Sequence, residues 1–216
     1  MMRFTVFPLV AIATIFGIAF AGPISLEERS SGLSCGPVLQ TTDKLGYGDS
    51  TGGYPRFTLG KKVDEHGQWQ VTQLEDGAET LNVNIRGCNS TYLGLYSNTN
   101  DEAVFMNPYG YVSFGKIFLA EDNSKCLQRH ETLPSSDPNK STHITVEECS
   151  NDDDATQARQ FWYFQDMYNT ANPLIKATSG DMPFIPLDIF LSNTSPPALI
   201  TSRKNAGAPE NAINLS

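Results

Sequence analysis

The chain has 216 residues, 24 of them acidic and 15 lysine or arginine, so its formal net charge is −9 at pH 7. That balance, with the basic residues scattered along the chain, disfavours nucleic acid and anionic membrane surfaces as partners, because both are bound through basic patches. The length is sufficient for a single domain with a sizeable core.

Residues 1–21 have the features of a secretory signal peptide. Arg3 supplies the positive start, residues 6–19 are apolar, and Ala19-Phe20-Ala21 fits the small-x-small pattern of a cleavage site. A membrane anchor is the alternative, but the apolar run is short for a span of about 20 residues and no charged cluster follows it. We therefore predict a secreted, extracellular protein without membrane insertion, with a flexible polar leader over residues 22–34.

From residue 35 the chain becomes a succession of short β-type runs. The clearest is at residues 81–85, where Leu81, Val83 and Ile85 alternate with polar neighbours. No convincing amphipathic helix longer than about ten residues is present. The sequence predicts an all-β domain over residues 35–204 and a loose tail over residues 205–216. Candidate strands occupy residues 56–59, 68–73, 81–85, 91–95, 103–107, 111–114, 117–120, 125–129, 143–149, 161–164, 174–177, 187–191 and 199–201.

The best-defined stretch runs from residue 125 to residue 164. It begins with a strand that contains Cys126, and its second strand ends at Cys149. Gln160-Phe161-Trp162 follows after a second, acidic loop. An indole is large enough to fill the floor of a core, and a buried glutamine amide can satisfy nearby backbone groups. We therefore interpret Gln160 and Trp162 as structural residues.

This order resembles one repeat of the ricin B-type lectins, in which a Cys-Leu strand, a strand ending in Cys and a Gln-x-Trp strand recur. The resemblance covers about 40 residues. It implies a single β-trefoil of about twelve short strands, with carbohydrate or a glycoprotein as the partner. Repeats of that family that bind galactose carry an aspartate, an aromatic residue and an asparagine at three positions that hold Gln128, Glu147 and Arg159 here. The residues that hold the repeat together are present, and those that grip the sugar are replaced.

Four cysteines follow the signal segment, and an exported protein meets oxidising conditions. Four cysteines allow three pairings. The resemblance favours Cys126–Cys149 within the repeat, which leaves Cys35–Cys88. A metal site is the competing interpretation, but no two cysteines have CxxC spacing and none lies beside a histidine.

One stretch has the composition of a sugar site outside the replaced positions. Asn107-Pro108 predicts a turn that exposes Tyr109, with Tyr111 close by. An aromatic face that stacks on a pyranose, with an amide for its hydroxyls, is the usual pattern. The alternative is that both tyrosines pack under a hairpin. Trp69, like Trp162, is assigned to the core.

Four Asn-x-Ser/Thr motifs occur, and export would make them candidate glycosylation sites. We favour Asn89, which directly follows Cys88, and Asn139, which lies in a polar loop.

Catalytic patterns are weak. The three histidines, His66, His130 and His143, lie in polar stretches and are interpreted as solvated surface residues, and no Gly-x-Ser-x-Gly motif is present. The acidic run at residues 152–154 is interpreted as a solvated loop, since successive side chains point in different directions. It lacks the interleaved spacing of a calcium loop. We expect no metal and no cofactor.

These observations favour a secreted, non-catalytic carbohydrate-binding module of lectin type, degenerate in its sugar sites. The alternative is a secreted protein-interaction protein on the same scaffold. A small secreted glycosidase is the third candidate, and would need two carboxylates about 5–10 Å apart in one cleft.

Overall fold

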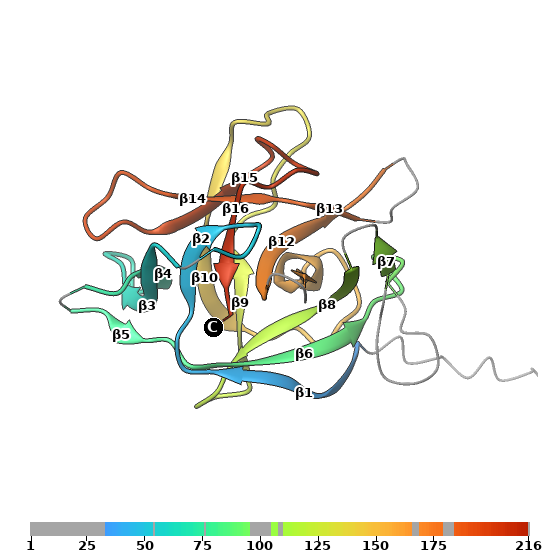
Figure 1. Ribbon diagram of the computed structural model, residues 1–216, viewed down its shortest axis with the longest axis horizontal. Helices are drawn as coiled ribbons and strands as arrows, with labels where there is room; N and C mark the ends of the chain where they lie inside the picture. Colours follow the sequence, from blue (N-terminus) through green and yellow to red (C-terminus); the bar gives the residue numbers. More distant parts are fainter. Residues whose placement is uncertain are drawn as a thin grey trace, which may run out of the picture. The chain divides into compact units, whose positions relative to one another are not determined.

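The structure, a computed structural model, describes residues 33–53, 55–75, 77–95, 105–107, 110–165, 169–178 and 184–215, with 105–107 and 110–112 described by their backbone alone. Within these residues sixteen strands form one antiparallel sheet, and one short 3-10 helix, η1 (Gln157–Gln160), is present (Figure 1). The first eight strands are β1 (Ser34–Thr42), β2 (Gly46–Asp49), β3 (Phe57–Val63), β4 (Trp69–Gln73), β5 (Glu79–Thr80), β6 (Val83–Asn89), β7 (Phe105–Asn107) and β8 (Gly110–Leu119). The others are β9 (Lys125–Arg129), β10 (Ser141–Glu148), β11 (Trp162–Gln165), β12 (Thr170–Lys176), β13 (Phe184–Pro186), β14 (Asp188–Leu191), β15 (Leu199–Ser202) and β16 (Asn211–Asn214).

The strand pairings close on themselves. From β8 they run through β11, β12, β16, β2, β3, β4 and β10, and β9 returns to β8 because it pairs with both β10 and β8. β6 and then β1 extend the sheet from β8, while β15 and β14 extend it from β10. Each strand of the closed path therefore has two neighbours, which leaves it without an open edge.

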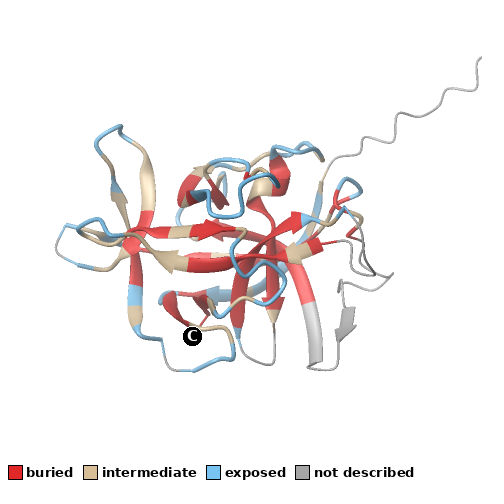
Figure 2. Cartoon of the chain, turned by 90° about the horizontal axis from the view of Figure 1, so that it is seen from above, coloured by how far each residue is buried: buried red, intermediate tan, exposed pale blue. Residues whose placement is uncertain are grey.

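The main hydrophobic core draws a buried side chain from every strand of this closed path. Trp162 on β11 is fully buried, and its Nε1 donates a hydrogen bond to the carbonyl of Leu127 on β9 at 3.1 Å. In Figure 2 the buried residues follow the strands and the exposed residues follow the connecting loops. The predicted structural role of Trp162 agrees with this position.

The all-β class is confirmed, but the predicted number of about twelve strands is too low. β1, β2, β5, β13 and β16 were not among the sequence candidates. β1 is mostly exposed, and the others are four residues or shorter, so none carries an apolar alternation long enough to read. The described residues contain no helix with the length and apolar content needed to cross a bilayer.

The C-terminal segment is a second difference, because the sequence predicts a loose tail from residue 205 and the structure places β16 there. β16 pairs with β2 on one side and with β12 on the other, and Ile213 is fully buried. The buried carboxylate of Asp188 accepts hydrogen bonds from the backbone N–H of Asn211 at 2.9 Å and from the side chain of Asn205 at 3.1 Å. The folded domain therefore extends to residue 215.

We expect Ile213→Val to lower the free energy of unfolding by about 1 kcal/mol, since it removes one methylene from a packed site. Urea denaturation measures the change. Ile185→Val, at a position that is only half-buried, is the control and should change stability less. An effect of Ile213→Val below about 0.3 kcal/mol would mean that the tail is not packed against the core.

Candidate functional site

Two disulfides are present, and each joins two neighbouring segments of the sheet near the end of a strand. Cys35 on β1 is joined to Cys88 on β6, with 4.0 Å between their Cα atoms. Cys126 on β9 is joined to Cys149, directly after β10, with a Cα separation of 5.1 Å. These are the pairings that the sequence analysis favours, and the described residues contain no free cysteine.

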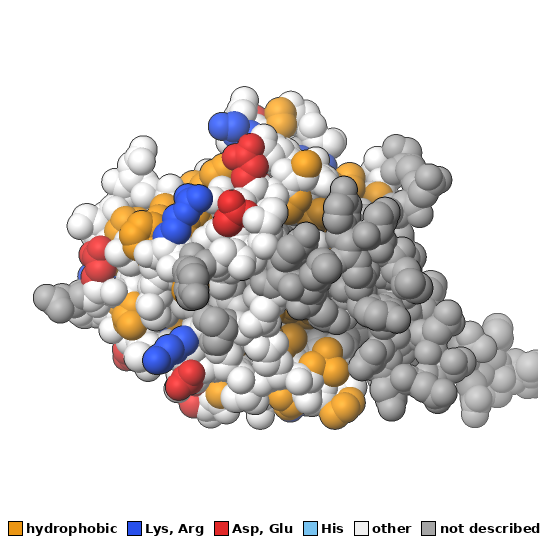
Figure 3. Space-filling view, in the orientation of Figure 1, with side chains coloured by type: hydrophobic (Ala, Val, Ile, Leu, Met, Phe, Trp, Pro, Cys, Tyr) orange, Lys and Arg blue, Asp and Glu red, His pale blue; other side chains and the backbone are white. Residues whose placement is uncertain are grey.

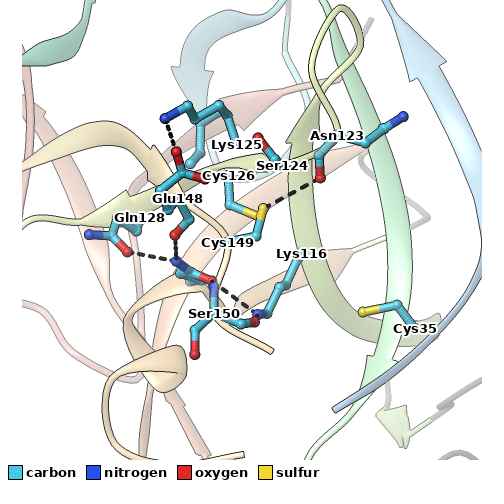
Figure 4. Close-up of a disulfide and its surroundings, with 12 residues drawn as sticks. Cys35, Lys116, Asn123, Ser124, Lys125, Cys126, Gln128, Glu148, Cys149 and Ser150 are labelled. Atoms are coloured by element: carbon cyan, nitrogen blue, oxygen red, sulfur yellow. Dashed lines mark hydrogen bonds and ion pairs between the residues drawn. A yellow bond between two sulfur atoms is a disulfide. The ribbon is translucent and has the colours of Figure 1, made fainter. Parts of the chain in front are cut away.

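Next to the second disulfide, the buried amide of Gln160 joins four groups (Figure 4). Its Oε1 accepts hydrogen bonds from the backbone N–H of Ser150 at 2.9 Å and from Nζ of Lys116 at 3.0 Å. Its Nε2 donates to Oε1 of Gln128 at 2.9 Å and to the carbonyl of Glu148 at 2.7 Å. The amide thereby holds the loop after β10 against β9, which agrees with the structural role predicted for it.

A hollow of about 540 Å³ lies over this network, between the β3–β4 hairpin and strands β9 and β10. We call it the tryptophan hollow, because Trp69 lines it. Gln128, Glu147 and Arg159 line it as well, and these are the three positions at which the repeat differs from galactose-binding ones. The structure therefore brings the replaced residues together around one space.

Trp69 departs from its predicted place in the core. It is half-buried: it packs against the edge of the main core and lines the hollow. Nζ of Lys61 lies 5.1 Å from the centre of the Trp69 ring. The Lys61 ammonium is paired with the carboxylates of Glu121, at 2.7 Å, and Glu79, at 3.5 Å. This packing fixes the indole at the border between core and hollow.

Two glutamates line the hollow, and Glu147 is half-buried whereas Glu148 is exposed. Burial alone would raise the pKa of Glu147, but hydrogen bonds from His130, Thr145 and Gln128 outweigh burial, so the pKa lies below its usual range. Thr145 Oγ1 donates to Glu147 Oε1 at 2.8 Å. Gln128 Nε2 lies close enough to lower the pKa, but it has no hydrogen-bond partner of normal geometry. Glu147 is therefore ionised at neutral pH, beside a buried donor with capacity to spare.

A second cavity, of about 550 Å³, adjoins the first. All three histidines of the chain line it, so we call it the histidine cavity. His66 comes from the β3–β4 hairpin and is exposed, whereas His130 and His143, from the ends of β9 and β10, are half-buried. Residues 194–196 of the β14–β15 loop form part of its wall. The sequence predicts three unrelated surface histidines, and nothing in their spacing signals that they converge.

Gln68 stands between the two cavities and lines both, as does His66. Gln68 Nε2 donates a hydrogen bond to Glu147 Oε1 at 3.0 Å and lies 2.9 Å from Nδ1 of His130. The same His130 nitrogen is 3.1 Å from Glu147 Oε1. A proton on Nδ1 of His130 therefore points at the carboxylate that also serves the tryptophan hollow.

The acidic run at residues 152–154 lies in a surface loop, as predicted: Asp152 and Asp154 are exposed, and Asp153 is half-buried. Asp153 accepts hydrogen bonds from Ser90 Oγ and the backbone N–H of Thr91, both at 2.6 Å, and from Gln157 Nε2 at 2.8 Å. Asp154 accepts from two backbone N–H groups at the start of η1. Both carboxylates are used to hold loops. In the described part of the chain, no three His, Cys, Asp or Glu side chains gather closely enough for a metal ion.

The remaining predicted residues stay predictions. Asn107 ends β7 and Tyr111 lies on β8, where only the backbone is described, and Tyr109 lies outside the described residues. Asn139 is exposed in the β9–β10 loop, whereas Asn89 is half-buried at the end of β6. The geometry therefore favours Asn139 as the better glycosylation acceptor.

Comparison with known proteins adds no relative. No family model, no curated protein and no solved structure matches the chain. The class of the protein thus follows from the fold and its cavities alone: an all-β, disulfide-linked domain with two adjoining polar hollows.

Proposed function

We propose that the protein is a secreted, non-catalytic carbohydrate-binding module and that the tryptophan hollow holds the sugar. The observation that carries the proposal is the meeting of a half-buried indole with Gln128, Glu147 and Arg159 around one space. Sugar sites combine an aromatic face with a few polar groups, because a pyranose has one apolar face and a rim of hydroxyls.

Each of these side chains has a suitable role in that binding. The indole of Trp69 stacks against the apolar face of the ring. The ionised carboxylate of Glu147 accepts hydrogen bonds from sugar hydroxyls, and Gln128, which is buried beside it, helps to keep that carboxylate ionised. Arg159 uses Nη1 on the carbonyl of His130, which orients the guanidinium at the wall of the hollow.

A binding role fits this chemistry better than a glycosidase. A glycosidase needs a carboxylic acid that keeps its proton near neutral pH. The pKa of Glu147 is lowered instead, and the neighbouring Glu148 is paired with Nζ of Lys125. Incubation with a panel of oligosaccharides and assay of new reducing ends tests this point, and measurable hydrolysis would contradict a pure binding role.

We also propose that the closed sheet is a β-trefoil of ricin B-type. The Cys126–Cys149 disulfide, the bonding of Gln160 and the burial of Trp162 support this, because they are the features on which the resemblance rests. The larger number of strands counts against it. A crystal structure decides the matter: residues near 35–85, 86–123 and 124–202 should superpose through a threefold axis.

Secretion is part of the proposal. Two disulfides fit an oxidising compartment, and residues 1–21 have the pattern of a signal peptide. On the face shown in Figure 3, the described lysine and arginine side chains are interspersed with acidic ones and form no basic patch there.

The test is a glycan array followed by titration of the best neutral ligand against variants. We expect Trp69→Ala to weaken binding about tenfold or more, which corresponds to about 1.4 kcal/mol of lost binding energy. Isothermal titration calorimetry measures the loss, and a thermal unfolding curve shows whether the variant remains folded.

Tyr92→Ala is the matched control. Tyr92 is another partly exposed aromatic residue that stacks under a lysine, Lys176, and it lines neither cavity. Its removal should leave affinity unchanged. Equal affinity of the Trp69→Ala variant and the unchanged protein would refute the assignment of the hollow. Capture of a protein partner that sugars do not compete away would favour the protein-interaction alternative.

A further inference from the structure

The histidine cavity gathers in one place all the side chains of this protein that ordinarily change charge between pH 5 and 8. Among the described residues, the imidazole of His143 makes no hydrogen bond. His66 is 3.6 Å from one carboxylate, that of Glu65. Only His130 is tied into a network, through its Nδ1. The cavity therefore presents ring nitrogens that the fold itself does not use.

We propose that the histidine cavity is an anion subsite, which takes the carboxylate or sulfate group of an acidic sugar when its histidines are protonated. The inference rests on the proposed function, since it assigns to the tryptophan hollow the neighbouring ring of the same glycan. An acidic glycan would thus be held at mildly acidic pH and released as the pH rises.

The charges that face the cavity support this assignment. The β3–β4 hairpin contributes Lys62, Asp64 and Glu65, and Glu147 touches His130 from β10. Beside His130, Glu131 is paired with Lys140 at 2.8 Å, and Arg159 donates to the carbonyl of His130. The lining residues of the β14–β15 loop carry no charge. With neutral imidazoles the cavity is therefore net negative and repels an anion. Three protonated imidazoles reverse the sign, which makes the cavity attractive for a carboxylate or sulfate.

Two of the acidic groups at the rim, Asp64 and Glu147, are already engaged by other donors, whereas Glu65 faces His66 at 3.6 Å and competes for that ring. Asp64 Oδ1 accepts from the backbone N–H of His66 at 2.9 Å and of Gln68 at 2.8 Å, and its Oδ2 accepts from Gln70 Nε2 at 2.8 Å. Glu147 likewise accepts hydrogen bonds from Gln68 and Thr145. An incoming anion is thus the natural partner for His143.

The position of the cavity fits a ligand that extends across both spaces. His66 and Gln68 line both cavities, so the two cavities adjoin at these residues. A ring stacked on Trp69 would place the next sugar of a chain over Gln68. That residue touches both His130 and Glu147, so the two subsites share one hydrogen-bond network.

The experiment is an NMR titration that observes the imidazole signals, which are few because the chain has three histidines. The probes are glucuronate and its methyl ester, and glucose 6-sulfate and glucose, each added to the full folded protein at pH 5.5 and at pH 8. We expect saturable shifts with glucuronate or the sulfate at pH 5.5, and a dissociation constant at least tenfold lower there than at pH 8. The uncharged partner of each pair should show no such pH dependence. Comparison of the two acids identifies whether carboxylate or sulfate is preferred.

His143→Gln should remove most of the gain in affinity at pH 5.5, and His66→Gln, at an exposed position that does not affect folding, should remove part of it. Lys44→Gln, which removes an exposed positive charge that lines neither cavity, is the control and should change nothing. The inference is overturned if the anions cause no saturable shift at pH 5.5, or if they bind equally at both pH values. It is also overturned if His143→Gln and His66→Gln bind like the unchanged protein.

Failure of neutral sugars to bind, with the anions still bound at pH 5.5, would instead overturn the role of the tryptophan hollow and leave the anion subsite standing.

Discussion

Replacement of Trp162 by alanine is expected to lower the free energy of unfolding by about 4 kcal/mol. The indole is fully buried in the main core, and its Nε1 donates to the carbonyl of Leu127 on β9. The smaller side chain leaves a large cavity and an unpaired buried carbonyl, and each adds to the cost. Urea denaturation followed by circular dichroism measures the change.

Trp69→Ala is the matched control for stability, as it removes the same side chain from a half-buried position at the edge of the core. Trp69→Ala should lower the free energy of unfolding less than Trp162→Ala does, and yet abolish most sugar binding. Any loss of binding by Trp162→Ala should come from its loss of folded protein. Equal losses of stability for the two variants would mean that Trp162 does not hold the core together.

Stability is expected to rise by about 2 kcal/mol between pH 7.5 and pH 9.5 because of Lys116. Lys116 is fully buried, and burial lowers its pKa to about 8, against the opposite influence of Asp153 and Asp154. In the unfolded chain the pKa returns to about 10.5. Between these values the unfolded chain keeps a proton that the folded protein has released, so raising the pH favours the folded state.

Lys116→Met removes this titrating group, so the rise due to Lys116 should be absent from its unfolding free energy. Burial also lowers the pKa of Arg129 to about 9, and the smaller rise that remains belongs to that group. Lys140→Met, at an exposed lysine, should keep the rise. The measurement stops at pH 9.5 because burial raises the pKa of Tyr47, which would lower stability at higher pH. A flat profile for the unchanged protein would contradict the lowered pKa of Lys116.

The local architecture around the second disulfide could be predicted from the sequence. The candidate strand at residues 125–129 coincides with β9, and the candidate at 143–149 differs from β10 by two residues at its start and one at its end. These strands are read easily because Ile144 and Val146 alternate with polar residues and point into the core. The Cys126–Cys149 pairing was implied by the resemblance to a ricin B-type repeat, which left Cys35–Cys88, and the core position of Trp162 was predictable because its indole is large enough to fill a core.

The cavities could not be predicted, because they depend on contacts between residues distant in sequence. His66 and His143 line the same cavity because β4 lies beside β10, where Gln70 pairs with Thr145. Trp69 follows an apolar pattern, which does not distinguish a core position from the border of a hollow. Lys116 gives no signal either, because the acceptors that allow its burial, Ser150 and Gln160, lie far along the chain.

The place of β16 has a consequence for how the chain is made. β2 and β12 are among the strands of the closed path, and β16 is the strand that joins them. During synthesis, strands β1 to β15 emerge before β16, the strand that pairs with both β2 and β12. Until β16 is available, the edges of β2 and β12 that it covers stay unpaired, and unpaired strand edges are the sites at which chains pair wrongly with one another.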